Sequence, residues 1–264
     1  MKAWEGCIAS PVAERSEKPR NIGLTMVIDK GLGLSATRDL VDVASPYADI
    51  VKFTFGTSAF YDKEFCREKI RILRDAGIWV MPGGTFLEVA VWQGRYFEYL
   101  KRAKELGFDT IEVSDGTIDM DLGTREEVIK RARDEGFTVI SEVGKKDPSE
   151  ALPMETLCRL VERDVEWGTF KVIVEAREAG RGIGIYDKEG KVKEGEVDRI
   201  VSLIGDPNVL IWEAPLKAQQ QYLILRFGAN VNLGNVPPED ILALEALRQG
   251  LRGDTLKKAY REGR

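Results

Sequence analysis

The sequence predicts a single (β/α)8 TIM barrel, and three observations support that fold. The chain has 264 residues, a size at which alternating strands and helices usually form one barrel domain. Eight short β-rich runs alternate along it with helical patterns. Charged or amide side chains occur at the ends of most runs, as expected where strand ends surround an active site. An open doubly wound sheet is the alternative, because alternation alone does not show that the sheet closes.

The predicted strands are short runs rich in residues that favour extended structure. They span residues 24–28, 50–55, 78–81, 110–113, 138–140, 170–174, 209–212 and 230–233. Pro11 and Pro19 interrupt regular structure near the start of the chain. We therefore expect an N-terminal arm at 1–20 and a barrel domain at 21–264.

Helix boundaries are indicated by capping residues between these runs. Asp62 is a suitable start for the helix after the second strand, and Gly77 a suitable stop. Thr124 and Glu127 have the T-x-x-E spacing of a capping box, which predicts a helix start at Thr124. Pro153 precedes a further apolar pattern of helical spacing.

Composition excludes several classes of function. The chain has no histidine, so it can have neither a Ser-His-Asp or Cys-His catalytic site nor a His-ligated zinc ion. Cys7, Cys66 and Cys158 form no C-x-x-C pair, which argues against a disulfide framework and favours a reducing, cytoplasmic setting. The net charge of −5 argues against broad nucleic-acid binding. No signal peptide or membrane-length apolar run is recognisable.

Residues 31–36 match the dinucleotide-binding pattern G-x-G-x-x-A. That pattern also requires an acidic residue at the end of the next strand, where this chain has Lys52 inside the strand instead. We therefore interpret residues 31–36 as a glycine turn that opens the first helix. A second glycine-rich segment, residues 180–184, is either a lid over a substrate or a plain long connection.

Three carboxylates at predicted strand ends, Glu142, Glu175 and Glu213, suggest a cation site. Mg²⁺ usually takes one or two carboxylates together with substrate oxygens. The alternative is that each glutamate pairs with a lysine or arginine across the barrel mouth. We favour a functional role for at least one of them, because perturbed carboxylates gather in catalytic clefts.

Positive side chains near the same ends predict an anionic ligand. They are Lys52, Lys145, Lys146 and Arg177, and Lys52 interrupts an otherwise apolar strand. Residues 232–235, Asn-Leu-Gly-Asn, follow the last predicted strand, where barrels often bind phosphate. A purely structural Asn-Gly turn is the alternative at that position.

Nine segments in a fixed order resemble one known family. They are residues 25–31, Lys52 with 56–57, 83–85, 112–116, 141–146 (Ser-Glu-Val-Gly-Lys-Lys), 175–178 (Glu-Ala-Arg-Glu), 213–215, 232–235 and 250–255. Together they are similar to the phosphosulfolactate synthase family, and the likeness runs from about Lys18 to Thr255. Ala179 departs from the serine expected after the Glu-Ala-Arg-Glu segment.

The resemblance implies a (β/α)8 barrel that adds sulfite to phosphoenolpyruvate with the help of Mg²⁺. The product would be (2R)-2-phospho-3-sulfolactate, formed through an enediolate that a lysine protonates. In methanogens this reaction begins coenzyme M biosynthesis, and in some bacteria it leads to sulfolactate. The expected partners are these small anions and other copies of the chain in a homo-oligomer, with no nucleic acid and no membrane.

The residue roles that we expect follow from the resemblance together with the strand-end positions. Lys145 is the first candidate for the acid and Lys146 the second, with Lys52 binding the carboxylate or sulfite. The metal candidates are Glu142 and Glu175, with Asp115 and Glu213 in reserve. The phosphate candidates are Arg177, Asn232, Gly234 and Asn235.

Two other functions stay open on the sequence alone. One is a barrel aldolase whose lysine forms a Schiff base with a carbonyl substrate. The other is a non-catalytic relative, since the family also includes plant heat-stress proteins whose role is not tied to this reaction.

Overall fold

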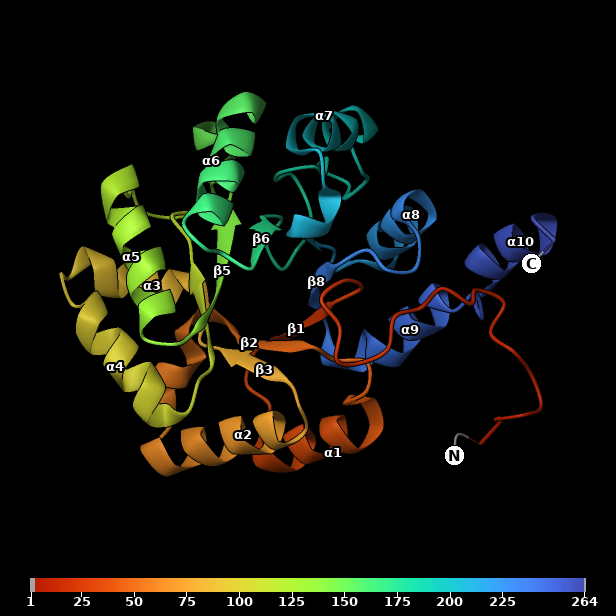
Figure 1. Ribbon diagram of the computed structural model, residues 1–264, viewed down its shortest axis with the longest axis horizontal. Helices are drawn as coiled ribbons and strands as arrows, with labels where there is room; N and C mark the ends of the chain where they lie inside the picture. Colours follow the sequence, from red (N-terminus) through yellow and green to blue (C-terminus); the bar gives the residue numbers. More distant parts are fainter. Residues whose placement is uncertain (1–2, 264) are drawn as a thin grey trace.

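The protein is a (β/α)8 barrel of eight parallel strands surrounded by helices (Figure 1). The computed structural model describes residues 3–263. The strands are β1 (Thr25–Asp29), β2 (Ile50–Phe53), β3 (Trp79–Met81), β4 (Thr110–Val113), β5 (Thr138–Val143), β6 (Lys171–Val174), β7 (Leu210–Glu213) and β8 (Leu233–Val236). Barrel closure, which alternation could not show, is confirmed.

Helices follow each strand and cover the outside of the barrel. They are α1 (Leu34–Ala44), α2 (Lys63–Asp75), α3 (Gly84–Trp92), α4 (Tyr96–Leu106), α5 (Leu122–Asp134), α6 (Met154–Glu166), α7 (Glu194–Ile204), α8 (Lys217–Phe227), α9 (Ile241–Arg248) and α10 (Gly253–Arg261). Short 3₁₀ turns are η1 (Thr54–Phe60), η2 (Pro148–Glu150), η3 (Pro207–Val209) and η4 (Pro238–Asp240). None of the helices in residues 3–263 is long and apolar enough to cross a membrane.

The order of strands around the sheet is β3-β2-β1-β8-β7-β6-β5-β4, so β3 and β4 are its two ends. These ends lie next to each other and complete the ring. At this β3–β4 junction the Val80 amide donates to the Asp109 carboxylate at 2.8 Å instead of to a strand carbonyl. The ring is therefore closed by packing and a side-chain hydrogen bond where the other strands share backbone ladders.

The core has two parts, as the alternation of side chains along each strand requires. Inside the barrel lies a small apolar layer. Its members are Leu24, Met26, Ile50, Met81, Ile140, Ile173 and Ile211. A larger apolar cluster lies between the strands and the helices. Lys52 and the buried glutamates continue the inward-facing positions above the small layer, at the C-terminal ends of the strands.

Several predicted boundaries were wrong; β2 ends at Phe53 and not at 55, and β5 continues to Val143 and does not end at 140. The helix α5 begins at Leu122 and is capped by Asp121, whose carboxylate accepts from Thr124 N at 3.0 Å, so Thr124 is not its cap. The last strand lies at 233–236 and not at 230–233. Asn230 instead bonds the N-terminal arm, since its Oδ1 accepts from Ser16 N at 2.9 Å. The predicted start at Asp62 is confirmed, because its side chain caps α2.

Strand β8 carries a bulge that shapes the barrel mouth. Thr25 pairs with Leu233 and Val27 with Val236, so Gly234 and Asn235 together face only Met26 of β1. A bulge of this kind re-aims the side chain that it displaces. Gly234 lies against the barrel interior, where an added Cβ would come within 2.6 Å of Met26. Asn235 is turned to the mouth.

Candidate active site

A cavity of about 190 Å³ opens at the C-terminal ends of the strands; we refer to it as the mouth cavity. It is lined by Ile28, Lys52, Thr54, Phe55, Gly83, Gly84, Thr85, Phe86, Glu112, Glu142, Lys146, Glu175, Arg177, Glu178, Glu213 and Asn235. These residues come from all parts of the chain and meet here only because the sheet closes. The position is the one at which TIM barrels carry their active sites.

Lys52 lies at the base of the mouth cavity among three glutamates. Its Nζ is 3.1 Å from Glu112, 3.3 Å from Glu142 and 3.4 Å from Glu213, and the side chain is buried. Burial alone would lower the pKa of this ammonium, but the surrounding carboxylates outweigh that effect and hold the pKa well above its ordinary value. Lys52 is therefore a fixed positive charge at neutral pH.

Lys146 reaches the same cavity from the loop after β5. Its Nζ donates to Glu142 Oε1 at 2.8 Å and to Glu175 Oε2 at 2.5 Å. Burial opposes the charge on Lys146, yet the two carboxylates prevail and raise its pKa. This lysine carries a proton at neutral pH and stands at the open side of the cluster, with a partly exposed side chain.

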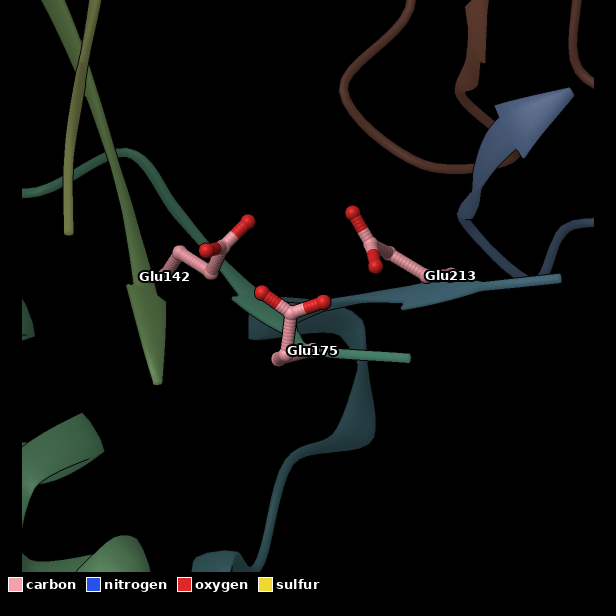
Figure 2. A group of neighbouring side chains, drawn as sticks. All are labelled: Glu142, Glu175 and Glu213. Carbon is pink, nitrogen blue, oxygen red and sulfur yellow. The ribbon is translucent and has the colours of Figure 1, made fainter. Parts of the chain in front are cut away.

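Glu142 is the penultimate residue of β5, Glu175 directly follows β6 and Glu213 is the last residue of β7. Their carboxylates point toward one another (Figure 2). One oxygen from each lies within 4.8 Å of the others, and all three residues are buried. The donors are all hard oxygens, which suit Mg²⁺ and exclude a preference for soft metals. These three residues could hold a divalent cation.

The charge balance of the cluster supports that fit. Burial and the neighbouring carboxylates Glu142 and Glu213 raise the pKa of Glu175 to about 10. Burial also raises the pKa of Glu112 to about 7, although Lys52 opposes the shift. Four buried glutamates thus exceed the two lysines that face them, and the cluster retains protons for lack of positive charge. A divalent cation would supply that charge and displace those protons.

Glu175→Gln is expected to stabilise the metal-free protein at alkaline pH. Between pH 4.5 and about 10 the folded state holds a proton on Glu175 that the unfolded chain has released. The free energy of unfolding of the wild-type protein therefore falls as pH rises through this range. Glutamine keeps the shape and cannot ionise. We expect the variant's Tm with EDTA to exceed that of the wild type by about 2–4 °C at pH 9.

The same melting experiment at pH 5 is the internal control, because there the two proteins should differ little. An equal difference at both pH values would assign the effect to packing. A lower Tm for the variant at pH 9 would contradict the proton balance described for the cluster.

Backbone strain is concentrated at the mouth cavity. Phe55, Arg177 and Asn235 have φ values of 57°, 60° and 52°, and they are the non-glycine residues with positive φ in the described part of the chain. All three line the cavity. Such conformations are sparsely populated and gather at functional sites. At Arg177 the turn is held by its own amide, which donates to Glu175 Oε1 at 2.6 Å.

Asn235 contributes an amide oxygen that has no hydrogen-bond partner within the described chain. The residue is 3% exposed, and its Oδ1 is buried without a hydrogen-bond partner among residues 3–263. Buried polar atoms are nearly always satisfied in native proteins. A bound ligand or water in the mouth cavity would satisfy this one.

Lys145 and Asp115 lie outside the mouth cavity. Lys145 Nζ donates to the carbonyls of Asp115 at 2.8 Å and Ile118 at 3.0 Å, so it holds the loop between β4 and α5. Asp115 forms an ion pair with Arg125 at 3.2 Å. The structure therefore does not bring these two predicted residues to the glutamate cluster, whereas it does bring Lys146.

Asn232 lies at the opposite, N-terminal end of the barrel. Its side chain accepts from Leu24 N at 3.0 Å and donates to the carbonyls of Asn208 and Leu210 at 2.9 Å each. All its bonds thus join the starts of strands. Gly234 fills the barrel interior and does not line the mouth cavity. Of the four predicted phosphate residues, the structure brings Arg177 and Asn235 together.

Glu112 had no role in the sequence analysis although it belongs to the cluster. It interrupts an apolar strand at an inward-facing position, and Lys52 has the same placement in β2. Period-two alternation within the strands was the signal that would have found it. Gly83, which caps α3, and the first helical residues Gly84 and Thr85 also line the cavity. The backbone amides of a first helical turn have no partner within the helix.

Arg125 supports the cluster from behind. Its guanidinium binds Asp164 of α6 at 2.8 and 2.6 Å, the Glu142 carbonyl at 3.0 Å and Asp115 at 3.2 Å, and it is fully buried. We expect Arg125→Lys, which loses the forked geometry, to weaken Mg²⁺ binding about 10-fold or more, as loss of outer-shell partners does elsewhere. Titration calorimetry measures the affinity of both proteins for Mg²⁺.

The matched control is Arg131→Lys, an exposed change on the same helix that should leave Mg²⁺ binding unaltered. If Arg125→Lys lowered the melting temperature but kept wild-type affinity for Mg²⁺, Arg125 would be a packing residue and not a positioning one.

The sequence comparisons with known proteins agree on one family. The profile of the (2R)-phospho-3-sulfolactate synthase (ComA) family matches residues 13–254. The phosphosulfolactate synthase of Methanothermobacter thermautotrophicus is 45% identical over 246 residues, 92% of this chain and 95% of the relative. The phosphosulfolactate synthase of Methanocaldococcus jannaschii is 47% identical over 238 residues, 89% of this chain and 94% of the relative. The YdjI aldolase of Escherichia coli K12 shares the fold alone, with a TM-score of 0.54 at 14% identity over 92% of this chain and 90% of that chain.

Proposed function

Because the chain belongs to the (2R)-phospho-3-sulfolactate synthase family, we propose that it adds sulfite to phosphoenolpyruvate in a Mg²⁺-dependent reaction. The product is (2R)-2-phospho-3-sulfolactate. The observation that carries this proposal is the pairing of a three-glutamate cation site with Lys52 and Lys146 in one small cavity.

Charge explains why such a site needs a cation. Phosphoenolpyruvate and sulfite are both anions, so the four buried glutamates would repel them. The positive side chains in the cavity that would attract them are Lys52, Lys146 and Arg177. Mg²⁺, when bound, neutralises the glutamates and supplies positive charge for an enediolate. Glu142, Glu175 and Glu213 would hold it.

The remaining side chains have positions that suit the substrate groups. Arg177, Asn235 and the first-turn amides of α3 surround the cavity and would bind phosphate. Lys52 is buried in the lining of the cavity and would bind the substrate carboxylate or sulfite. Asn232 and Gly234 are not part of this proposed phosphate site, since neither lines the cavity.

The reaction requires one bond to form and one proton to arrive. The sulfur lone pair of sulfite bonds to C3 of phosphoenolpyruvate, and the C2–C3 π electrons move into the carboxylate to form an enediolate. Lys146 then donates its proton to C2 from one face, and bisulfite or solvent restores that proton. Lys146 is suited to this step because its raised pKa keeps it protonated until a strong base forms nearby.

The direct test is incubation with phosphoenolpyruvate, sulfite and Mg²⁺, followed by phosphorus NMR. We expect a new phosphate-ester resonance and loss of phosphoenolpyruvate, both dependent on sulfite and abolished by EDTA. A well-folded sample that consumes no phosphoenolpyruvate under these conditions would contradict the proposal and support a non-catalytic role.

The structure gives the Schiff-base alternative little support. A Schiff-base lysine needs a lowered pKa so that its amine is free, whereas the three neighbouring glutamates hold the pKa of Lys52 well above its ordinary value. We expect borohydride to trap no adduct in the presence of substrate. A covalent adduct on Lys52 or Lys146 would favour the aldolase.

We propose that the protein acts in the cytoplasm, because its three cysteines are free. Cys66 and Cys158 are buried and Cys7 is exposed, and all are unpaired. Free thiols persist most readily in a reducing compartment.

A further inference from the structure

We propose that a second cavity, on the outer wall of the barrel, binds a small aromatic carboxylate and is coupled to the mouth cavity through Phe86. This outer cavity has a volume of about 300 Å³ and lies between η1, α2 and α4. Its lining includes Tyr61, Lys63, Cys66, Phe86, Tyr99 and Arg102. That volume is at the lower end of the range for small-molecule sites.

The walls favour an aromatic ring. Tyr61, Phe86, Tyr99 and Phe108 contribute four aromatic side chains, and the first three are only half-buried. Cys66 adds to the apolar surface, because burial raises the pKa of its thiol to about 11 and keeps it neutral. Aromatic side chains prefer edge-to-face or offset contact with other rings. A flat apolar ligand therefore suits these walls.

One residue that lines the outer cavity carries a buried hydroxyl group without a hydrogen-bond partner in the described chain. The Tyr99 hydroxyl is buried and makes no hydrogen bond within residues 3–263. Burial, and then the charge of Glu112, raise the pKa of Tyr99 well above its ordinary value, so the hydroxyl stays a donor. An oxygen atom on the ligand would satisfy it, at a site where an unmet hydrogen bond is costly.

Positive charge lies at the entrance. Lys63 is exposed at the start of α2, and no acid in the described chain forms an ion pair with it. Arg102 is exposed beside it in the lining and shares its charge with Glu105 at 3.1 Å. The outer cavity has no acidic side chain in its lining. A carboxylate on the ligand would complement this entrance.

Phe86 connects the outer cavity with the mouth cavity, because it lines both. Its ring packs edge-to-face on Tyr99 with centroids 5.4 Å apart. Phe86 also belongs to the first turn of α3, and Gly84 and Thr85 of that turn line the mouth cavity too. A ligand that shifts Phe86 would therefore move the first turn of α3, which is part of the proposed phosphate site. Such coupling requires that Phe86 make different contacts in the ligand-free and ligand-bound states of the outer cavity.

The test uses 4-hydroxybenzoate as the probe and titration calorimetry on the wild-type protein. We expect saturable binding of one probe per chain. Tyr99→Phe, which removes only the hydroxyl, should weaken binding about 2–10-fold. Lys63→Gln should weaken binding of 4-hydroxybenzoate but not of neutral 4-hydroxybenzyl alcohol, and Lys101→Gln, an exposed change on α4 outside the lining, should alter neither.

Binding and coupling are decided separately. The absence of saturable binding at about 10 mM 4-hydroxybenzoate would overturn the proposed site. The site would also be overturned if Lys146→Met removed binding and Tyr99→Phe left it intact, because the probe would then lie in the mouth cavity. With the site established, saturating probe should change the KM for phosphoenolpyruvate at least about twofold. An unchanged KM would overturn the coupling through Phe86. The binding results do not depend on synthase activity, so they stand even if the proposed function fails.

Discussion

Lys146→Met is expected to lower kcat by roughly 10²–10⁴-fold, the range that a general acid contributes. Methionine keeps the length and apolar stem of the side chain but has no proton to give to C2. It also removes the cation between Glu142 and Glu175, which lie 2.8 and 2.5 Å from Lys146 Nζ. Mg²⁺ occupancy must therefore be kept saturating, and single-turnover consumption of phosphoenolpyruvate is the measurement.

Lys145→Met is the matched control, one residue away in the same loop. Its Nζ binds carbonyls of the loop between β4 and α5 and does not reach the mouth cavity. We expect a smaller loss of kcat, accompanied by a lower melting temperature because that loop loses its brace. If Lys145→Met abolished turnover while Lys146→Met retained it, the assignment of the acid would be reversed.

Glu142→Gln is expected to weaken Mg²⁺ binding by about 100-fold or more, at or beyond the upper end of what the loss of an outer-shell partner costs. Glu142 is in contact with both lysines of the cavity and is one of the three clustered carboxylates. Its pKa is held well below its ordinary value, since Lys146 and Lys52 outweigh the effect of burial. It is thus the carboxylate that enters the metal site already ionised.

The measurement is the Mg²⁺ concentration that gives half-maximal activity, together with calorimetry in the absence of substrate. Glu178→Gln is the control, because Glu178 lines the mouth cavity but is exposed and outside the cluster. A metal titration unchanged by Glu142→Gln would remove this residue from the proposed ligands.

Most of the fold could be predicted because the strands are short, apolar and regularly spaced. Closure of the ring did not follow from strand–helix alternation, which is common to open and closed sheets, but from the chain length and the polar residues at the strand ends. The inward-facing residues Lys52, Glu142 and Glu213 were identifiable because a charge inside an apolar strand is rarely a packing solution. Glu112 satisfied the same condition and lies in one of the nine segments, but it was given no role in the site.

Residues beyond the strand ends were harder to assign. After β5 the chain turns at Gly144, whose φ is 117°, and the alternation that fixes side-chain direction no longer applies. Which of Lys145 and Lys146 reaches the mouth depends on the distant loop at residues 115–119, to which Lys145 binds. Sequence spacing carries no information about that contact.

The last strand was misplaced for a similar reason. Asn230 and Asn232 alternate with apolar residues as in a strand, but their amides bind the arm and the starts of other strands. The bulge at Gly234 and Asn235 then shifts the register by one residue, and only the paired β1 reveals it. Tertiary contacts decided both outcomes.

The junction between β3 and β4 makes the barrel a split ring. Seven neighbouring strand pairs share backbone ladders, and this eighth contact depends on one side-chain bond and on packing. Local opening of the sheet should therefore begin at this junction, where the free energy of opening is lowest and backbone amide protons should exchange with solvent fastest. The connection between β3 and β4 is also the natural place for the new termini of a circular permutant, because these two strands share no backbone ladder.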